Sequence, residues 1–131
     1  MNNSKHSNVL IIGGGCAGIS VASRLHSLKS DLNISIIEPS DKSLYQAAWT
    51  LVGAGAYDKD KTIKSMSEVM PSYVNWIKSH AQSFSPESNT VKTSDGDCTY
   101  DYLVVCPGLK LNFDGVAGLK ESLGKNNVCT N

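Results

Sequence analysis

A glycine-rich turn between two apolar segments is the feature that most constrains how this chain folds. The turn reads GGGCAG and directly follows the apolar run Val9–Ile12. After it, apolar residues recur at helical spacing from Ala17 to Leu28, and a second apolar run occupies Ile34–Ile37. Continuous apolar runs of this length are typical of parallel strands buried on both faces. Strand, turn, helix and strand within about thirty residues predict one βαβ unit.

Each glycine of the turn has a physical task in such a unit. Gly13 allows the tight turn out of the strand, and Gly15 lets the backbone approach a pyrophosphate because it has no Cβ. Gly18 lets the helix pack closely on the sheet. The pattern therefore predicts a dinucleotide site at the start of the helix.

Two further features support this interpretation. The N–H groups around Cys16 and Ala17 begin the predicted helix, where they and the helix dipole favour a phosphate. Glu38 stands twenty positions after Gly18, at the end of the second strand, where a carboxylate accepts hydrogen bonds from ribose hydroxyls and disfavours a 2′-phosphate. The alternative is a glycine-rich turn without a ligand, together with a surface glutamate.

The segment after Pro39 bears on which dinucleotide binds. An NAD domain would continue into another helix and a third parallel strand, whereas this chain has an aperiodic stretch, a short amphipathic helix that Pro71 ends, and a hairpin at Asp95-Gly96. That pattern favours FAD. We expect an α/β fold: a Rossmann-like FAD-binding domain with a parallel sheet core and an antiparallel β-hairpin insertion, truncated. The predicted segments are a polar tail (1–8), the incomplete domain (9–108) and the start of a linker toward a second domain (109–131).

Composition excludes several other classes of protein. Twelve basic and twelve acidic residues cancel, which gives no indication of a nucleic-acid partner. The polar N-terminus has no signal-peptide core, and no apolar run is long enough to cross a membrane. The four cysteines are scattered without a CxxC pair, so we expect no metal site and no disulfide. We expect mostly buried, reduced thiols, most clearly at Cys98 and Cys106.

Six segments, in order along the chain, resemble sulfide:quinone oxidoreductase, a family in the superfamily of flavoproteins with two dinucleotide-binding domains. They are VLIIGGGCAGISVASRL, IIEPSDK, YQAAWTLVGAGAY, VNWIK, YDYLVVCPGLKLNFDGVAGL and NNVCTN. YQAAWTLVGAG is the most specific, although Ala47 stands where relatives commonly carry proline. The resemblance implies an enzyme that oxidises sulfide at a cysteine disulfide and passes electrons through FAD to a membrane quinone. It implies further that this chain alone is inactive, because the second dinucleotide domain and the quinone pocket are missing.

The resemblance also implies roles for individual residues. Ala81 falls where a strand backbone meets the adenine, Cys106-Pro107-Gly108 where a tight turn lies beside the cofactor, and Gln46 and Trp49 in the loop that approaches the flavin. Packing or loop hydrogen bonding is the alternative for Gln46 and Trp49. Cys129 matches a third, catalytic cysteine, and a plain thiol is its alternative. The predicted FAD contacts are Gly13, Gly14, Gly15, Cys16, Ala17, Gly18, Glu38, Pro39, Gln46, Ala81 and Gly108.

Members of this family are peripheral membrane proteins, which work at the inner face of a bacterial membrane or at the mitochondrial inner membrane. By resemblance, we expect membrane contact through regions that this chain does not contain. Two alternatives stay open. One is another flavin reductase of the pyridine-nucleotide-disulfide type, such as a type II NADH dehydrogenase or the flavoprotein subunit of a sulfide dehydrogenase. The other is a non-catalytic nucleotide-binding module.

Overall fold

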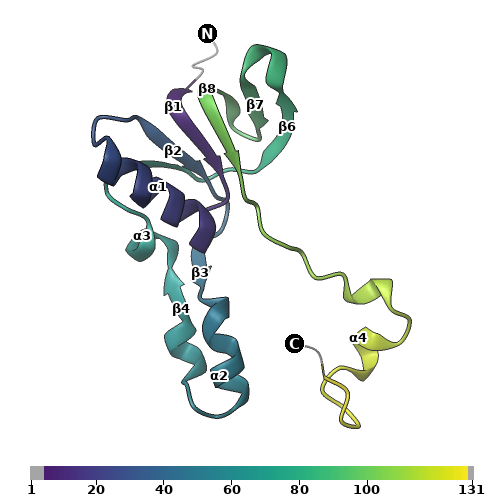
Figure 1. Cartoon of the computed structure of the whole chain (residues 1–131). Coiled ribbons are helices and arrows are strands. Elements are labelled where there is room, and N and C mark those ends of the chain that lie inside the picture. Colours follow the sequence, from purple (N-terminus) through teal and green to yellow (C-terminus); the bar gives the residue numbers. More distant parts are fainter. Residues whose placement is uncertain (1–4, 130–131) are drawn as a thin grey trace.

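The central element of the fold is a six-stranded sheet with strand order β5-β2-β1-β8-β7-β6 (Figure 1). The computed structural model describes residues 5–129, so the outer ends of the predicted segments 1–8 and 109–131 lie outside the described residues. Four neighbouring strands run parallel, from β5 to β8, and the remaining pairs are antiparallel. The predicted α/β class with a parallel sheet core is confirmed.

The predicted βαβ unit is present as β1 (Lys5–Ile12), α1 (Cys16–Leu28) and β2 (Ile34–Ile37). β1 begins four residues earlier than the apolar pattern indicates, because Lys5–Ser7 pair with β8 through the backbone. The hydroxyl of Ser7 is buried against that of Ser35, at 2.6 Å. Backbone pairing and one buried hydroxyl pair thus extend the strand past its apolar part.

A third parallel strand contradicts one expectation. β5 (Val74–Ile77) pairs parallel with β2, whereas the sequence pattern indicated none. The last part of the crossover before it holds the single-turn helix α3 (Met66–Val69), and a four-residue strand carries no periodic signal for its direction. The predicted short amphipathic helix before Pro71 is present as this single turn, and the preceding residues form strand β4 (Ile63–Ser65). The absence of a third parallel strand therefore cannot serve as an argument for FAD.

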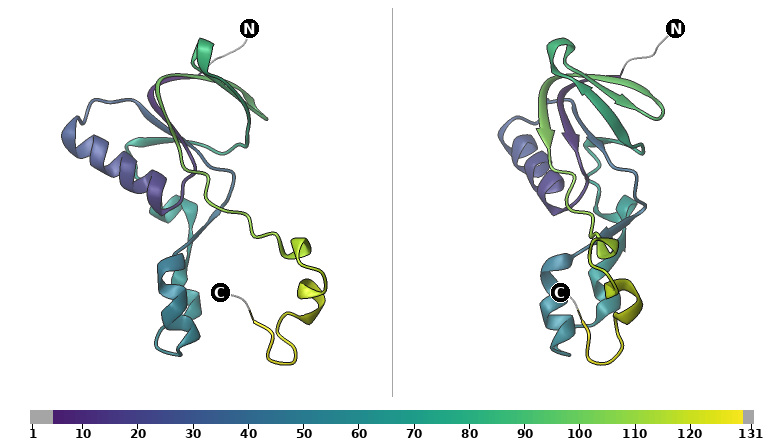
Figure 2. Two further views of the ribbon diagram at one scale, coloured as in Figure 1. Left: turned by 45° about the vertical axis from the view of Figure 1, so that its right-hand side comes forward. Right: turned by 90° about the vertical axis from the view of Figure 1, so that its right-hand side faces the viewer.

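An arm, residues 42–65, interrupts this crossover. It consists of β3 (Lys42–Leu44), a 3-10 turn (Gln46–Ala48), α2 (Trp49–Gly53), a second 3-10 turn (Lys59–Thr62) and β4. β3 pairs antiparallel with β4 in a sheet of their own. Both views in Figure 2 show the arm projecting away from the main sheet.

The antiparallel part of the sheet consists of β6 (Ala81–Ser85), β7 (Thr90–Thr93) and the first residues of β8 (Gly96–Val105). The predicted hairpin between β7 and β8 is confirmed, and Gly96 has a φ of +124° at its turn. β8 joins two parts of the sheet, because its residues 96–99 pair with β7 while its residues 98–105 pair with β1. After β8 the chain continues through a 3-10 turn (Phe113–Gly115) to α4 (Leu119–Ser122), away from the sheet (Figure 1).

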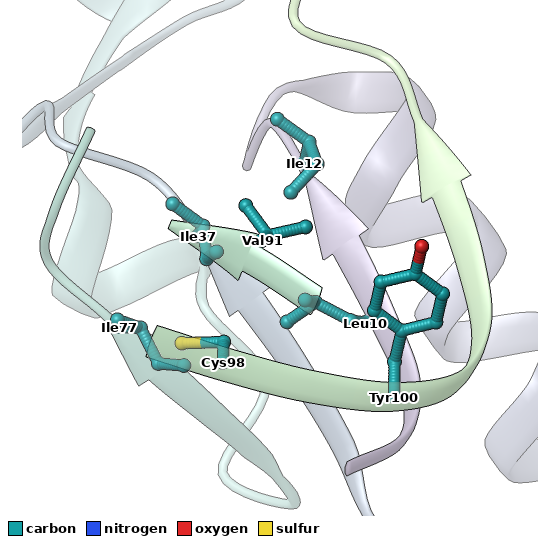
Figure 3. Packing of buried hydrophobic residues seen from close by; sticks show 7 residues of the cluster. All are labelled: Leu10, Ile12, Ile37, Ile77, Val91, Cys98 and Tyr100. Atoms are coloured by element: carbon teal, nitrogen blue, oxygen red, sulfur yellow. The ribbon is translucent and has the colours of Figure 1, made fainter. Parts of the chain in front are cut away.

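Apolar side chains cover both faces of the sheet. On one face, α1 packs through Ala22 on a cluster of Val9, Ile11, Ile34, Ile36 and Val74. On the other face, Figure 3 shows the antiparallel strands closing over the sheet, in a cluster of Leu10, Ile12, Ile37, Ile77, Val91, Cys98 and Tyr100. Among residues 5–129, no helix has the length and apolar character needed to cross a membrane.

Candidate functional site

The glycine turn lies at the carboxyl end of β1, between the ends of β2 and β8. Gly13 has a φ of +102°, which favours glycine, and its N–H donates to the Ile37 carbonyl at 2.9 Å. A Cβ on Gly13 would overlap the carbonyl oxygen of Cys106. The turn is therefore held between two neighbouring strands, in a conformation that requires glycine.

Gly18 and Gly15 have different surroundings, as the sequence predicts. A Cβ on Gly18 would overlap the Gly13 carbonyl oxygen and lie 3.2 Å from Cγ2 of Ile11, so this glycine lets α1 pack on the sheet. A Cβ on Gly15 would meet nothing within 4 Å. Gly15 precedes α1, where backbone N–H groups have no partner within the helix. The open side of the turn therefore lies at Gly15, where a phosphate would be favoured.

Glu38 is bound to the turn itself. Its Oε2 accepts a hydrogen bond from the Gly14 N–H at 2.9 Å, and its Oε1 accepts one from the Ser40 N–H at 2.8 Å. A Cβ on Gly14 would lie 2.8 Å from Cβ and Cγ of Glu38, so only glycine allows this approach. A carboxylate has about four acceptor positions, so two remain for a ligand. The sequence predicted acceptors for ribose but not these two backbone donors.

A groove of about 550 Å³ connects these elements, within the usual range for ligand sites. Its lining includes six of the predicted cofactor residues: Gly15, Cys16, Ala17, Glu38, Gln46 and Gly108. The remaining predicted residues do not line it: Gly13, Gly14, Gly18, Pro39, Ala81 and Cys129. Of these, Gly13, Gly14 and Gly18 fix the conformation and packing of the turn through close backbone contacts. A contact of Pro39 or Ala81 with the cofactor stays a prediction.

The arm and the crossover supply groove residues that the sequence did not single out. They are Ser40, Lys42, Ser43, Leu44, Tyr45, Ala47 and Met66. All but Met66 follow Glu38 within nine residues, so their position after the carboxyl end of a strand could have indicated them. Met66 comes from α3, and its N–H donates to the Asp41 carbonyl at 2.7 Å. Lys42 adds a positive charge to the lining of the groove, which suits an anionic ligand.

Trp49 lies outside this groove. Its side chain is 43% exposed and lines a separate apolar hollow with Leu44, Val52 and Ile63. Gln46, three residues earlier, does line the groove. Of the two residues in this loop, only Gln46 thus lies beside the glycine turn in the described structure.

The four cysteines divide into two kinds. Cys98 is buried and Cys106 half-buried, and burial raises the pKa of both thiols. Cys16 and Cys129 are exposed, so the expectation of mostly buried thiols is wrong for these two. Cys16 lines the groove through its place at the start of α1, whereas Cys129 lies in the segment after α4. A catalytic role of Cys129 stays a prediction.

Comparison with known proteins agrees with this geometry. The family model described as pyridine nucleotide-disulphide oxidoreductase matches residues 7–131. The mitochondrial sulfide:quinone oxidoreductase of Dictyostelium discoideum is 47% identical over 94% of this chain, and the mouse protein 35% over 96%. The crystal structure of the Aquifex aeolicus sulfide:quinone oxidoreductase superposes with a TM-score of 0.70 at 33% identity, over 84% of this chain and 26% of that one.

These matches confirm the resemblance stated from the sequence. The chain spans about 28% of the length of the two curated relatives.

Proposed function

Because the chain belongs to the pyridine nucleotide-disulphide oxidoreductase family, we propose that its groove binds the ADP part of FAD in an oxidoreductase. The observation that carries this proposal is the pairing of an open Gly15 with a fixed Glu38 along one groove. The pyrophosphate would lie against the backbone at Gly15 and the start of α1, and the adenosine ribose at the free acceptor positions of Glu38. Gln46 and the turn at Gly108 would border the cofactor farther along the groove.

The native protein containing these residues would oxidise sulfide and reduce quinone, as the names of its relatives state for those proteins. FAD, when bound, would supply the carrier for the two electrons that move between the sulfur donor and the quinone. The described residues hold and orient this cofactor, while Cys129 would assist at the sulfur step. Since membrane quinones dissolve in lipid, we also propose that the protein works at a membrane surface.

Replacement of Glu38 by Gln tests the cofactor site. Glutamine keeps the size but has a single acceptor oxygen, so one of the backbone donors of Gly14 and Ser40 loses its partner and ribose loses a charged acceptor. A hydrogen bond to a charged group contributes about 1.5–3 kcal/mol, so FAD affinity should fall roughly ten- to a hundredfold in a titration of the apoprotein. Glu87→Gln, at an exposed position outside the groove, is the matched control. Equal FAD affinity in both variants would remove Glu38 from the site.

The reaction is tested with the native holoprotein in liposomes that contain a ubiquinone. We expect sulfide-dependent quinone reduction, with little reduction when NADH replaces sulfide. Reduction with NADH and none with sulfide would favour the NADH dehydrogenase alternative. A flavin-free protein without either activity would favour the non-catalytic nucleotide-binding module.

A further inference from the structure

The indole of Trp76 bonds to the backbone of Glu38. Trp76 lies in β5, at the edge of the main sheet, in register with Ile36 of β2. Its Nε1 donates to the Glu38 carbonyl oxygen at 2.8 Å. The half-buried indole is not part of either apolar cluster, so this hydrogen bond is its most specific contact.

The end of the β2–β5 ladder explains why the carbonyl of Glu38 needs such a donor. The paired residues stop at Ile37 and Ile77, with one further hydrogen bond from the Glu38 N–H to the Ile77 carbonyl at 3.0 Å. In a continued parallel ladder the Ser79 N–H would donate to the Glu38 carbonyl, but this N–H donates to the Ile77 carbonyl at 2.9 Å instead. The indole of Trp76 therefore provides the donor that the ladder no longer supplies.

All four polar groups of Glu38 are consequently bonded within the chain. The N–H and the carbonyl bond to β5, and the two carboxylate oxygens bond to Gly14 and Ser40. This fixes the direction in which the free acceptor positions of the carboxylate point. A binding group fixed before its ligand arrives loses less entropy on binding than a free one.

We propose that Trp76 is a positioning residue for the dinucleotide, acting through Glu38. This inference rests on the proposed function, because it assigns Trp76 a part in the same ribose site. The indole holds the Glu38 backbone so that the carboxylate meets the adenosine ribose without rearrangement. Trp76 itself touches neither the cofactor nor the reacting atoms.

The test is a double-mutant cycle in the native protein, stripped of its flavin and titrated with FAD. Trp76→Phe keeps an aromatic ring but removes the N–H donor. A neutral hydrogen bond contributes about 0.5–1.5 kcal/mol, so FAD affinity should fall roughly two- to twelvefold. In the Glu38→Gln background the same change should have less than half that effect, because its route to the ribose is already lost. Tyr102→Phe, which removes a polar donor from an exposed ring outside the groove, should leave affinity unchanged.

A second ligand separates positioning from general stability. With an FAD analogue that carries a deoxyribose in its adenosine half, Trp76→Phe and wild type should bind nearly equally, because the bond to Glu38 is weakened in both. If Trp76→Phe does not fold, Trp76→Leu, which also lacks a donor and keeps an apolar side chain, takes its place. Equal affinity for FAD in wild type and variant, or an undiminished loss in the Glu38→Gln background, would overturn the inference. Wild-type apoprotein that does not bind FAD would instead overturn the proposed function.

Discussion

The main sheet together with α1, called the body below, and the arm bury their apolar residues to different extents. Leu10, Ile11 and Ile36 in the body are completely buried between α1 and the antiparallel strands. In the arm, Trp49 and Leu51 are 43% and 49% exposed, and Figure 1 shows α2 well away from the sheet. The body thus completes its own core, while the arm leaves apolar surface open among the described residues. The groove lies where the two regions meet: the body fixes the glycine turn and Glu38, and the arm adds Gln46.

The largest expected effect is on the folding of the body. Gly18→Ala would force a Cβ into the Gly13 carbonyl oxygen, a backbone atom that cannot move without breaking the turn. We expect a loss of about 4 kcal/mol or more in the free energy of unfolding, measured by urea denaturation of the native protein. Gly53→Ala in the arm is the control, since its Cβ would meet open space and should change stability by less than about 0.5 kcal/mol. Equal effects at the two sites would mean that α1 does not pack as described.

The second-largest effect is expected when a buried apolar side chain is shortened to alanine, a change that should distinguish the two regions. Ile36→Ala removes a side chain with no exposed surface, and such a change costs about 2–5 kcal/mol. Leu51→Ala, on the exposed part of α2, should change the free energy of unfolding by no more than about 0.5 kcal/mol in thermal or urea unfolding. A large loss for Leu51→Ala in the native protein would show that another part of that protein covers the arm.

Gly15→Val tests the open side of the turn without disturbing the packing of the body. Because a Cβ here meets nothing within 4 Å, the free energy of unfolding of the apoprotein should change by less than about 1 kcal/mol. The branched side chain would occupy the place of the pyrophosphate, so FAD affinity should fall by at least about a hundredfold and the purified protein should be colourless. A yellow variant with one flavin per chain would show that Gly15 does not face the cofactor.

The smallest effect concerns the thiols. Alkylation by iodoacetamide near neutral pH, followed by peptide mass spectrometry, should modify exposed Cys16 and Cys129 about tenfold faster than Cys98, whose pKa is raised by burial. Added FAD should slow the modification of Cys16 severalfold, because Cys16 lines the groove, and leave Cys129 unchanged. Equal protection of both thiols would place Cys129 against the cofactor as well.

The sequence predicts the body well and the arm poorly. Val9–Ile12, the glycines and Ile34–Ile37 carry strong local signals, and the structure confirms the βαβ unit they indicate. The arm has no clear period, and its strands β3 and β4 owe their pairing to each other across eighteen intervening residues. The direction of β5 and the bond from Trp76 to Glu38 depend on contacts between distant residues. Local patterns cannot show such contacts.

The pairing of β1 with two strands at very different distances along the chain has a consequence for how the protein folds. Its partner β2 follows within about twenty-five residues, whereas contacts with β8, such as that between His6 and Thr99, join residues 93 positions apart. Closing the longer loop costs more entropy, so we expect β1, α1 and β2 to associate first and β8 to join late. At about 5–20 residues per second, a ribosome needs on the order of 5 to 20 s to complete that interval. During this time the β8 side of β1 is an unpaired edge, which a chaperone could protect from aggregation.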